Sequence, residues 1–192
     1  ANSVRVCWAR EFYTRKTIVM AQPFAGIRVI DFTQVLAGPY STYQLASLGA
    51  EVIKVEHPKG GDQGRGLNTP TPESKEHGMS ALASAVNSGK RSLSLDLKHP
   101  DSRDVVDRLV QGADVLVENY KAGTMNKLGF GQARMRELNP KLVYCSISGF
   151  GQTGPRSNAA AYDPVIQAAS GIRSVTGYPE TGPTKVGFWV CD

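Results

Sequence analysis

The feature that most constrains this chain is a strand, a helix and a second strand that follow one another within about thirty residues. Residues 26–32 (GIRVIDF) form a short β-branched run after glycine, which predicts a strand. Residues 37–50 have a proline suited to a first helical turn, an apolar stripe and a glycine near the end, which predict a helix. Residues 51–57 (EVIKVEH) predict a second strand. Such a unit predicts two parallel strands joined by a right-handed crossover.

The same order recurs further along the chain. Further strands are predicted over residues 91–97, 114–120 and 141–151. An amphipathic helix is predicted over 99–113, and a short helix, ended by Pro140, over 131–140. Strands that alternate with helices predict the α/β class. The expected fold is a Rossmann-like parallel sheet with helices on its flanks.

Three segments are less regular. Residues 164–170 predict one more helix, and residues 184–192 (TKVGFWVCD) predict one more strand. The stretch between Lys59 and Lys90 is polar and rich in glycine and proline, so we expect a long excursion over the surface.

Length and composition set the class of protein. The 192 residues suit one domain with a real core, and 41% apolar with 20% charged residues is typical of a soluble globular protein. No apolar run approaches the roughly 20 residues of a membrane span.

The cysteines and histidines indicate neither disulfides nor a metal. The three cysteines are scattered and form no CxxC pair, which favours reduced thiols in a cytoplasmic protein. The three histidines stand singly without metal-ligand spacing, so no structural metal is expected.

The net charge of +5 is unevenly placed. In residues 1–20, Arg5, Arg10, Arg15 and Lys16 outnumber Glu11 by three, and the remainder of the chain carries +2. An acidic small molecule is therefore a better partner than nucleic acid.

Residues 1–19 do not match the body of the chain. They show neither a clear apolar period nor the apolar core of a secretory signal, and a well-patterned protein begins at Met20. We interpret residues 1–19 as a translated extension or a cloning artefact, with a transit peptide as a minor alternative.

The predicted strands end in polar or glycine-rich segments: DFTQVLAGP, VEHPKGGD, VENYKAG, SISGFGQTGP and WVCD. Ligands of open parallel sheets bind at the carboxyl ends of the strands, so these segments predict a site. The alternative is that such loops need Gly, Asn and Asp only to turn.

Seven stretches, taken in order, resemble the class III CoA-transferases, a family that also includes the α-methylacyl-CoA racemases. They cover about Gly26 to Asp192 and read GIRVIDFTxVLAGP, LGAEVIKVE, NxGKRSLxLDLK, ADVLVENY, GTMxKLG, NPKLVYCSISGFGQTGP and AYDPVIQAxSG. The resemblance implies that residues 20–192 are the N-terminal part of the family's large domain, without the small domain and the C-terminal return. It also implies a dimer of interlocked chains, so a homodimer or another self-association is expected.

The resemblance gives Asp192 the role of catalytic nucleophile, because it ends a segment similar to the family's GPxKVGxxxxD. In that family the matching carboxylate attacks an acyl-CoA thioester, and CoA passes through an aspartyl thioester to an acceptor carboxylic acid, so the same role is expected of Asp192. A carboxylate is a fair nucleophile, and a covalent intermediate divides a difficult exchange into easier steps. No permanently bound cofactor is implied, because coenzyme A and acyl-CoA are substrates. The alternative is that Asp192 is only a terminal residue, with its own α-carboxylate beside it.

The same resemblance implies the binding residues. Most would contact CoA, and two would form the acyl pocket. The CoA contacts are Gln34, Val35, Leu36, Ala37, His57, Leu95, Lys98, Asn119, Tyr120 and Lys127, and the pocket pair is Tyr162 and Asp163. Lys98 and Lys127 could equally be solvated surface lysines, and Tyr162 with Asp163 a buried structural pair.

Three other functions remain as alternatives. A racemase is less favoured, because the family's racemases have histidine where this chain has Tyr162, and tyrosine exchanges protons poorly near neutral pH. A truncated, non-catalytic relative would self-associate or bind CoA weakly. A nucleic-acid or membrane binder using residues 1–19 is disfavoured, because that segment has no amphipathic stripe.

Overall fold

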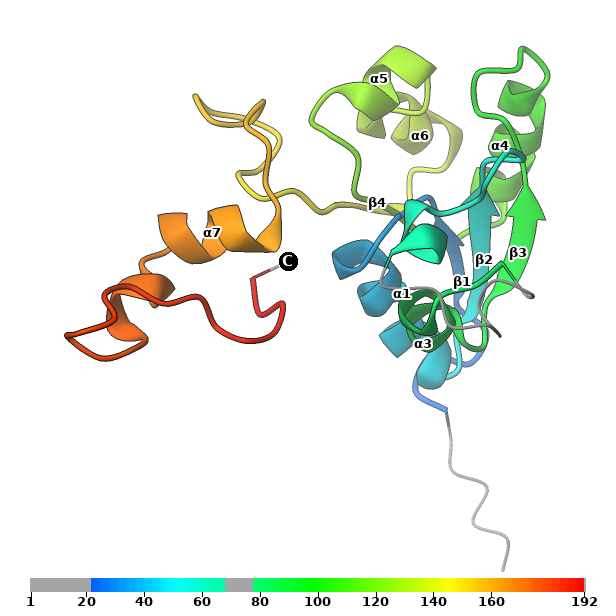
Figure 1. Cartoon of the computed structure of the whole chain (residues 1–192). Coiled ribbons are helices and arrows are strands. Elements are labelled where there is room, and N and C mark those ends of the chain that lie inside the picture. The colour runs from blue at the N-terminus through cyan, green and yellow to red at the C-terminus, as the bar shows by residue number, and fades with distance from the viewer. Residues whose placement is uncertain (1–21, 68–77, 192) are drawn as a thin grey trace, which may run out of the picture.

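A five-stranded parallel sheet forms the centre of the molecule (Figure 1). The computed structural model describes residues 22–67 and 78–191. The strands run in the spatial order β3-β2-β1-β4-β5, and every neighbouring pair is parallel. Their bounds are β1 Arg28–Asp31, β2 Glu51–Glu56, β3 Arg91–Ser94, β4 Val115–Glu118 and β5 Val143–Ser146. The predicted α/β class with a Rossmann-like parallel sheet is confirmed.

Helices cover both faces of the sheet (Figure 1). Side chains of a strand alternate between the faces, so Val29 of β1 packs towards α1, and Ile30 packs towards α4, α5 and α6. The helices and 3₁₀ turns are α1 Ala37–Ser47, η1 Gln63–Gly66, α3 Ala81–Asn87, α4 Ser102–Gln111, α5 Thr124–Leu128, α6 Gln132–Leu138, α7 Asp163–Ala169 and η2 Ile172–Val175.

Local sequence explains several of these boundaries. The Ser80 hydroxyl accepts the Ala83 N–H at 3.1 Å and thereby caps α3. Helix α4 buries Val106 and Val110, which lie one turn apart on the face towards the sheet. In the larger core cluster, Phe32 stacks on Phe130 with 6.4 Å between the ring centroids.

The segment after β5 leads away from the sheet to α7, which lies to one side of the sheet, and the end of the chain lies near α7 (Figure 1). The predicted strand over residues 184–192 is wrong for its described part, since residues 184–191 form no strand. Instead, the backbone N–H groups of Val186 and Cys191 donate hydrogen bonds to side chains of α7. The apolar run FWV therefore does not add to the sheet.

Two other expectations need correction. The stretch from 59 to 90 is more than an irregular surface excursion, because its described part contains η1 and α3. The strands predicted over 26–32, 91–97 and 141–151 are each shortened to four residues. Residues 1–19 lie outside the described residues, and within the described ones no helix is both long and apolar enough to cross a bilayer.

Candidate active site

Two loops meet where the sheet order reverses, between β1 and β4. The Gln34 N–H donates to Asn119 Oδ1 at 2.7 Å, and Asn119 Nδ2 donates back to the Gln34 carbonyl at 2.8 Å. The Gln34 side-chain amide also donates to the Tyr120 hydroxyl at 3.1 Å. Burial raises the pKa of Tyr120, so this phenol stays neutral at neutral pH. The loop after β1 is thus bonded to the loop after β4, at the point where open α/β sheets bind ligands.

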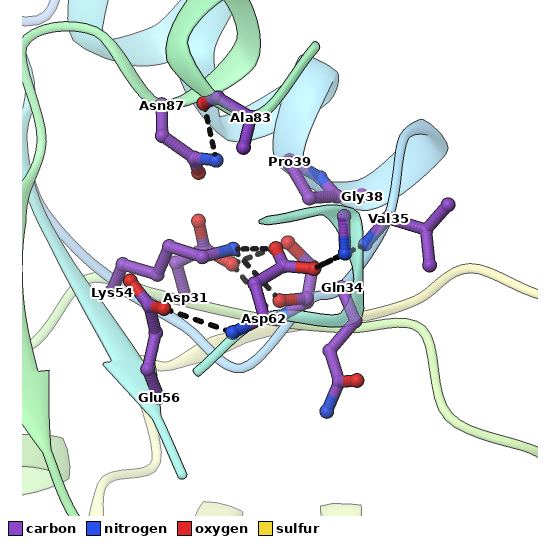
Figure 2. A network of polar contacts seen from close by, with 12 residues as sticks. Asp31, Gln34, Val35, Gly38, Pro39, Lys54, Glu56, Asp62, Ala83 and Asn87 are labelled. Carbon is purple, nitrogen blue, oxygen red and sulfur yellow. Dashed lines mark hydrogen bonds and ion pairs between the residues drawn. The ribbon is translucent and has the colours of Figure 1, made fainter. Parts of the chain in front are cut away.

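A group of buried charges lies beside this loop (Figure 2). Lys90 Nζ is 2.9 Å from Asp31 Oδ2, and Lys54 Nζ is 2.7 Å from Asp62 Oδ2. None of these four side chains is more than 2% exposed. Burial lowers the pKa of Lys90, although the Asp31 carboxylate opposes that shift. Buried charges are normally paired in this way.

A third ion pair completes the group. Arg65 donates to both oxygens of Glu56, at 2.7 and 2.9 Å, and the Asp62 N–H donates to Glu56 Oε2 at 2.9 Å. Burial by itself would raise the pKa of Glu56, but the Arg65 guanidinium and the Asp62 N–H outweigh burial and lower it. Glu56 therefore stays ionised and fixes the turn that carries Asp62.

Next to these loops is a cavity of about 510 Å³, here called the first cavity. It lies at the carboxyl ends of β1, β4 and β5, and the start of α7 closes one side. Its lining comprises Gln34, Val35, Ala37, Gln63, Asn119, Tyr120, Lys121, Ile147, Ser148, Gly149, Ala161, Tyr162, Ile166 and Cys191. The first cavity thus brings together Gln34, Val35, Ala37, Asn119, Tyr120 and Tyr162 from the predicted site residues.

A second cavity, of about 330 Å³, adjoins the first and is mostly apolar. Its lining comprises Val35, Leu36, Gln63, Leu67, Leu82, Tyr162, Asp163, Pro164 and Trp189. Val35, Gln63 and Tyr162 line both cavities, so they form the partition between them. Leu36 and Asp163, also predicted site residues, line only the second cavity.

Asp163 has a structural task in this arrangement. The residue is 1% exposed, its Oδ1 accepts the Cys191 N–H at 2.8 Å, and its Oδ2 accepts an N–H of Gln167 Nε2 at 2.7 Å. The side-chain oxygen of Gln167, Oε1, accepts the Val186 N–H at 2.9 Å. Asp163 and Gln167 therefore hold residues 186–191 against α7. Tyr162, by contrast, is 66% exposed.

Four predicted contacts line neither cavity. Leu95 packs against the core cluster, and Lys98 and Lys127 are exposed. His57 Nδ1 accepts the Lys59 N–H at 3.0 Å, and its Nε2 is 3.8 Å from Asp96 Oδ1. A role for these four towards a more distant part of a long ligand stays a prediction. Asp192 lies outside the described residues.

The first cavity also contains residues that the sequence did not single out. Ser148 Oγ is buried, and within the described part of the chain it has no hydrogen-bond partner. Lys121 adds an exposed ammonium group to the lining. Both closely follow a strand, so the rule that ligands bind at strand ends could have selected them.

The chemistry of the first cavity suits a polar, anionic ligand. Helix α1 begins at Ala37 in its wall, and the N-terminus of a helix favours negative charge. Lys121 supplies a positive charge, and Ser148 supplies a hydroxyl. Among the described residues no cluster of three or more His, Cys, Asp or Glu could hold a metal ion.

Known proteins are similar to this chain in both sequence and fold. The chain is 49% identical over 172 residues to the succinate–glutarate CoA-transferase of Agrobacterium fabrum, covering 88% of the chain and 43% of that relative. It is 45% identical over 165 residues to the acetyl-CoA:oxalate CoA-transferase of Acetobacter aceti, covering 86% of the chain and 41% of that relative. The crystal structure of a CAIB/BAIF family protein from Brucella suis superposes with a TM-score of 0.79 at 41% identity, covering 86% of the chain and 44% of that protein.

The chain spans less than half the length of these relatives. Within that span the agreement is continuous, because a family model described as CoA-transferase family III matches residues 24–192. The match includes the loops after β1 and β4 and the start of α7, which together line the first cavity. The chain therefore belongs to CoA-transferase family III.

Proposed function

We propose that the protein represented by this chain transfers CoA from an acyl-CoA donor to a carboxylic acid. The observation that carries the proposal is the family match over residues 24–192, combined with a cavity at the strand ends that is lined by Gln34, Val35, Ala37, Asn119 and Tyr120. Coenzyme A is a long anionic molecule. The α1 N-terminus and Lys121 offer positive electrostatic potential to such a ligand.

We propose Asp192 as the nucleophile. Its carboxylate oxygen attacks the thioester carbonyl, the C–S bond breaks, and CoA leaves as a thiolate while an acyl–aspartyl anhydride remains. The thiolate then attacks the aspartyl carbonyl of the anhydride, forms an aspartyl-CoA thioester and releases the donor acid. The acceptor carboxylate repeats the two steps in reverse order, which returns Asp192 and yields the new acyl-CoA. The oxyanions formed require hydrogen-bond donors nearby.

A short dicarboxylic acid is the acceptor that the relatives favour. The Agrobacterium relative is named for succinate and glutarate, and the Acetobacter relative for oxalate. Lys121 in the first cavity could pair with a second carboxylate of such an acid.

The test is mass spectrometry of the 192-residue chain after incubation with succinyl-CoA, with glutarate added in a second sample. The expected result is a CoA thioester on Asp192 that hydroxylamine removes, and glutaryl-CoA formation in the second sample. Asp192→Asn is the matched control, since it keeps the size of the side chain and removes the nucleophile. Acyl-CoA binding without an adduct in the unchanged chain would refute the nucleophile assignment.

A non-catalytic, self-associating protein is the second candidate, because the chain after α7 exposes large apolar side chains. Val175 is 84% exposed, Tyr178 75% and Phe188 66%. Exposed apolar surface favours association, so we propose a homodimer or a similar assembly. Sedimentation velocity at several concentrations tests this, and a monomer throughout would refute it.

A racemase is a less favoured candidate, and its assay is deuterium exchange at the α-carbon of a 2-methylacyl-CoA. The position that carries histidine in racemases is Tyr162 here, and no such exchange is expected. A cytoplasmic location, and the division into residues 1–19 as an extension and 20–192 as part of a large domain, remain proposals from the sequence.

A further inference from the structure

The backbone of the loop after β1 takes an unfavourable conformation at one residue. Val35 has a φ angle of +70°, and it is the sole non-glycine residue with positive φ among those the structure describes. In this left-handed region the side chain crowds the backbone, and a β-branched residue is seldom found there. Such a conformation persists where its surroundings enforce it, and it often marks a functional site.

The enforcing contact comes from Asp62. Its Oδ1 accepts the Val35 N–H at 2.8 Å and the Gly64 N–H at 2.7 Å. Asp62 has a relative exposure of 3%, so this acceptor is shielded from water, where charge-assisted hydrogen bonds are strong. The residue before Val35 is also tied, since Asn119 binds both backbone groups of Gln34.

Lys54 contacts the second carboxylate oxygen of Asp62 (Figure 2). Its ammonium group is 2.7 Å from Asp62 Oδ2 and donates to the Thr33 carbonyl at 2.9 Å. Lys54 is therefore bound both to the chain before Val35 and to the carboxylate that holds Val35. Without Lys54, the Asp62 carboxylate would be a buried charge with no counter-ion at this distance among the described residues.

The loop also fits closely around this turn. A Cβ on Gly64 would lie 3.2 Å from the Val35 carbonyl oxygen, so the backbone of η1 packs directly against Val35. Gln63, which follows Asp62, and Val35 are two of the three residues in the partition between the cavities. The conformation of this turn thus sets the shape of both cavities.

We propose that Lys54 and Asp62 are positioning residues, which hold Val35 in the left-handed conformation and so fix the partition between the two cavities. Neither acts on the substrate directly. Both work through Val35 and Gln63, the residues that line the cavities. The part of the proposal that concerns ligand binding rests on the proposed function, and the part that concerns the loop does not.

The first arm of the test needs no ligand. Positive φ brings the amide and α protons of one residue unusually close, so Val35 should show a strong intraresidue NOE between them. In Asp62→Asn the new NH₂ group must face either the Val35 and Gly64 N–H groups or the Lys54 ammonium group, so donors oppose each other in both orientations. We therefore expect Asp62→Asn, and likewise Lys54→Met, to lose that signal. The matched control is Lys90→Met, which breaks the neighbouring buried pair with Asp31 but does not touch Val35. A signal that survives in both loop variants, or that is lost equally in the control, would overturn the proposal.

The second arm is a double-mutant cycle on binding of CoA, measured by calorimetry, with Val35→Gly as the partner substitution. Glycine enters the left-handed region freely, so the Val35→Gly chain no longer needs Asp62 to enforce that conformation. We expect Asp62→Asn to raise Kd about 5- to 30-fold in the original chain. In the Val35→Gly background the rise should be about 3-fold or less.

The outcomes of the two arms separate the proposals. If Asp62→Asn weakens binding equally in both backgrounds, Asp62 acts on overall stability and the positioning role is refuted. If the unchanged chain binds no CoA, the proposed function fails for this chain, and the NOE arm alone decides the role of Lys54 and Asp62. Where Asp62→Asn fails to fold, Lys54→Met provides the same comparison.

Discussion

The Asp163–Gln167 pair allows a prediction of both sign and size. In Asp163→Asn, one carboxylate oxygen becomes an NH₂ group, which must face either the Cys191 N–H or Gln167 Nε2. Two donors then oppose each other at a position that is 1% exposed. The loss of a charge-assisted hydrogen bond and a buried donor without a partner together cost about 2–4 kcal/mol.

The compensating change is Gln167→Glu. Alone, it places a second carboxylate against Asp163 and should cost a similar amount. In the double variant, however, the new amide at position 163 accepts the Cys191 N–H and donates to the new carboxylate at position 167. The other oxygen of that carboxylate still accepts the Val186 N–H. Only the weak contact from position 167 to the Phe188 carbonyl, 3.3 Å long, loses its donor. The double variant should therefore recover to within about 1 kcal/mol of the original chain.

Native-state hydrogen exchange measures this locally. The amides of Val186 and Cys191 report on the segment, and the Phe32 amide, which donates to the Val117 carbonyl in the sheet, reports on the whole fold. Each single variant should speed exchange at Val186 and Cys191 much more than at Phe32. If the losses of the two single variants simply add in the double variant, the reciprocal bonding described above is refuted.

Three further predictions concern the sheet and its loops. Burial raises the pKa of Glu118, so its ionised form is penalised in the folded state, and stability from this group is lost as pH rises through that pKa. In urea titrations, the free energy of unfolding of Glu118→Gln should therefore rise relative to that of the original chain as pH increases from about 4 to about 7. A fall in this difference over the same pH range would contradict the prediction. Gly38→Ala should lower the free energy of unfolding by about 1–3 kcal/mol, because its Cβ would overlap Thr33 Cβ, and unchanged stability in the same titrations would refute the clash. Asn119→Ala should weaken CoA binding roughly 10-fold by freeing Gln34, and calorimetry should show no change for the control Asn139→Ala, a part-buried amide away from the cavities.

The sequence was sufficient to predict the strands of the sheet, because each strand is an apolar or alternating run bounded by turn residues. Residues 51–57 and 114–120 were predicted as strands, and β2 and β4 lie within those ranges. The segment 184–191 misled the prediction because FWV has the composition of a strand. Composition does not reveal whether a neighbouring strand is free to pair, and here α7 supplies the hydrogen bonds instead.

For the site, the sequence indicated the loops but not their internal bonding. Gln34, Asn119 and Tyr120 were predicted together and do lie in one wall. Lys54 could not be recognised, since a lysine within EVIKVE normally points to solvent, and only the tertiary fold shows a buried partner at Asp62. The short helix α3 was missed for a related reason, because seven residues carry too little periodicity to stand out from a polar stretch.

The hydrogen bonds that Asp62 and Asn119 make to the loop after β1 have a consequence for the synthesis of the chain. Gln34 is held by a residue 85 positions later, and Val35 by one 27 positions later. A ribosome adds about 5–20 residues each second, so Asp62 follows Val35 after roughly 1–5 seconds, and Asn119 follows Gln34 after roughly 4–17 seconds. The Asp62 contact becomes available first and the Asn119 contact only after β4 has been translated. The turn that lines both cavities therefore gains its full set of hydrogen bonds only after β4 and Asn119 have been synthesised.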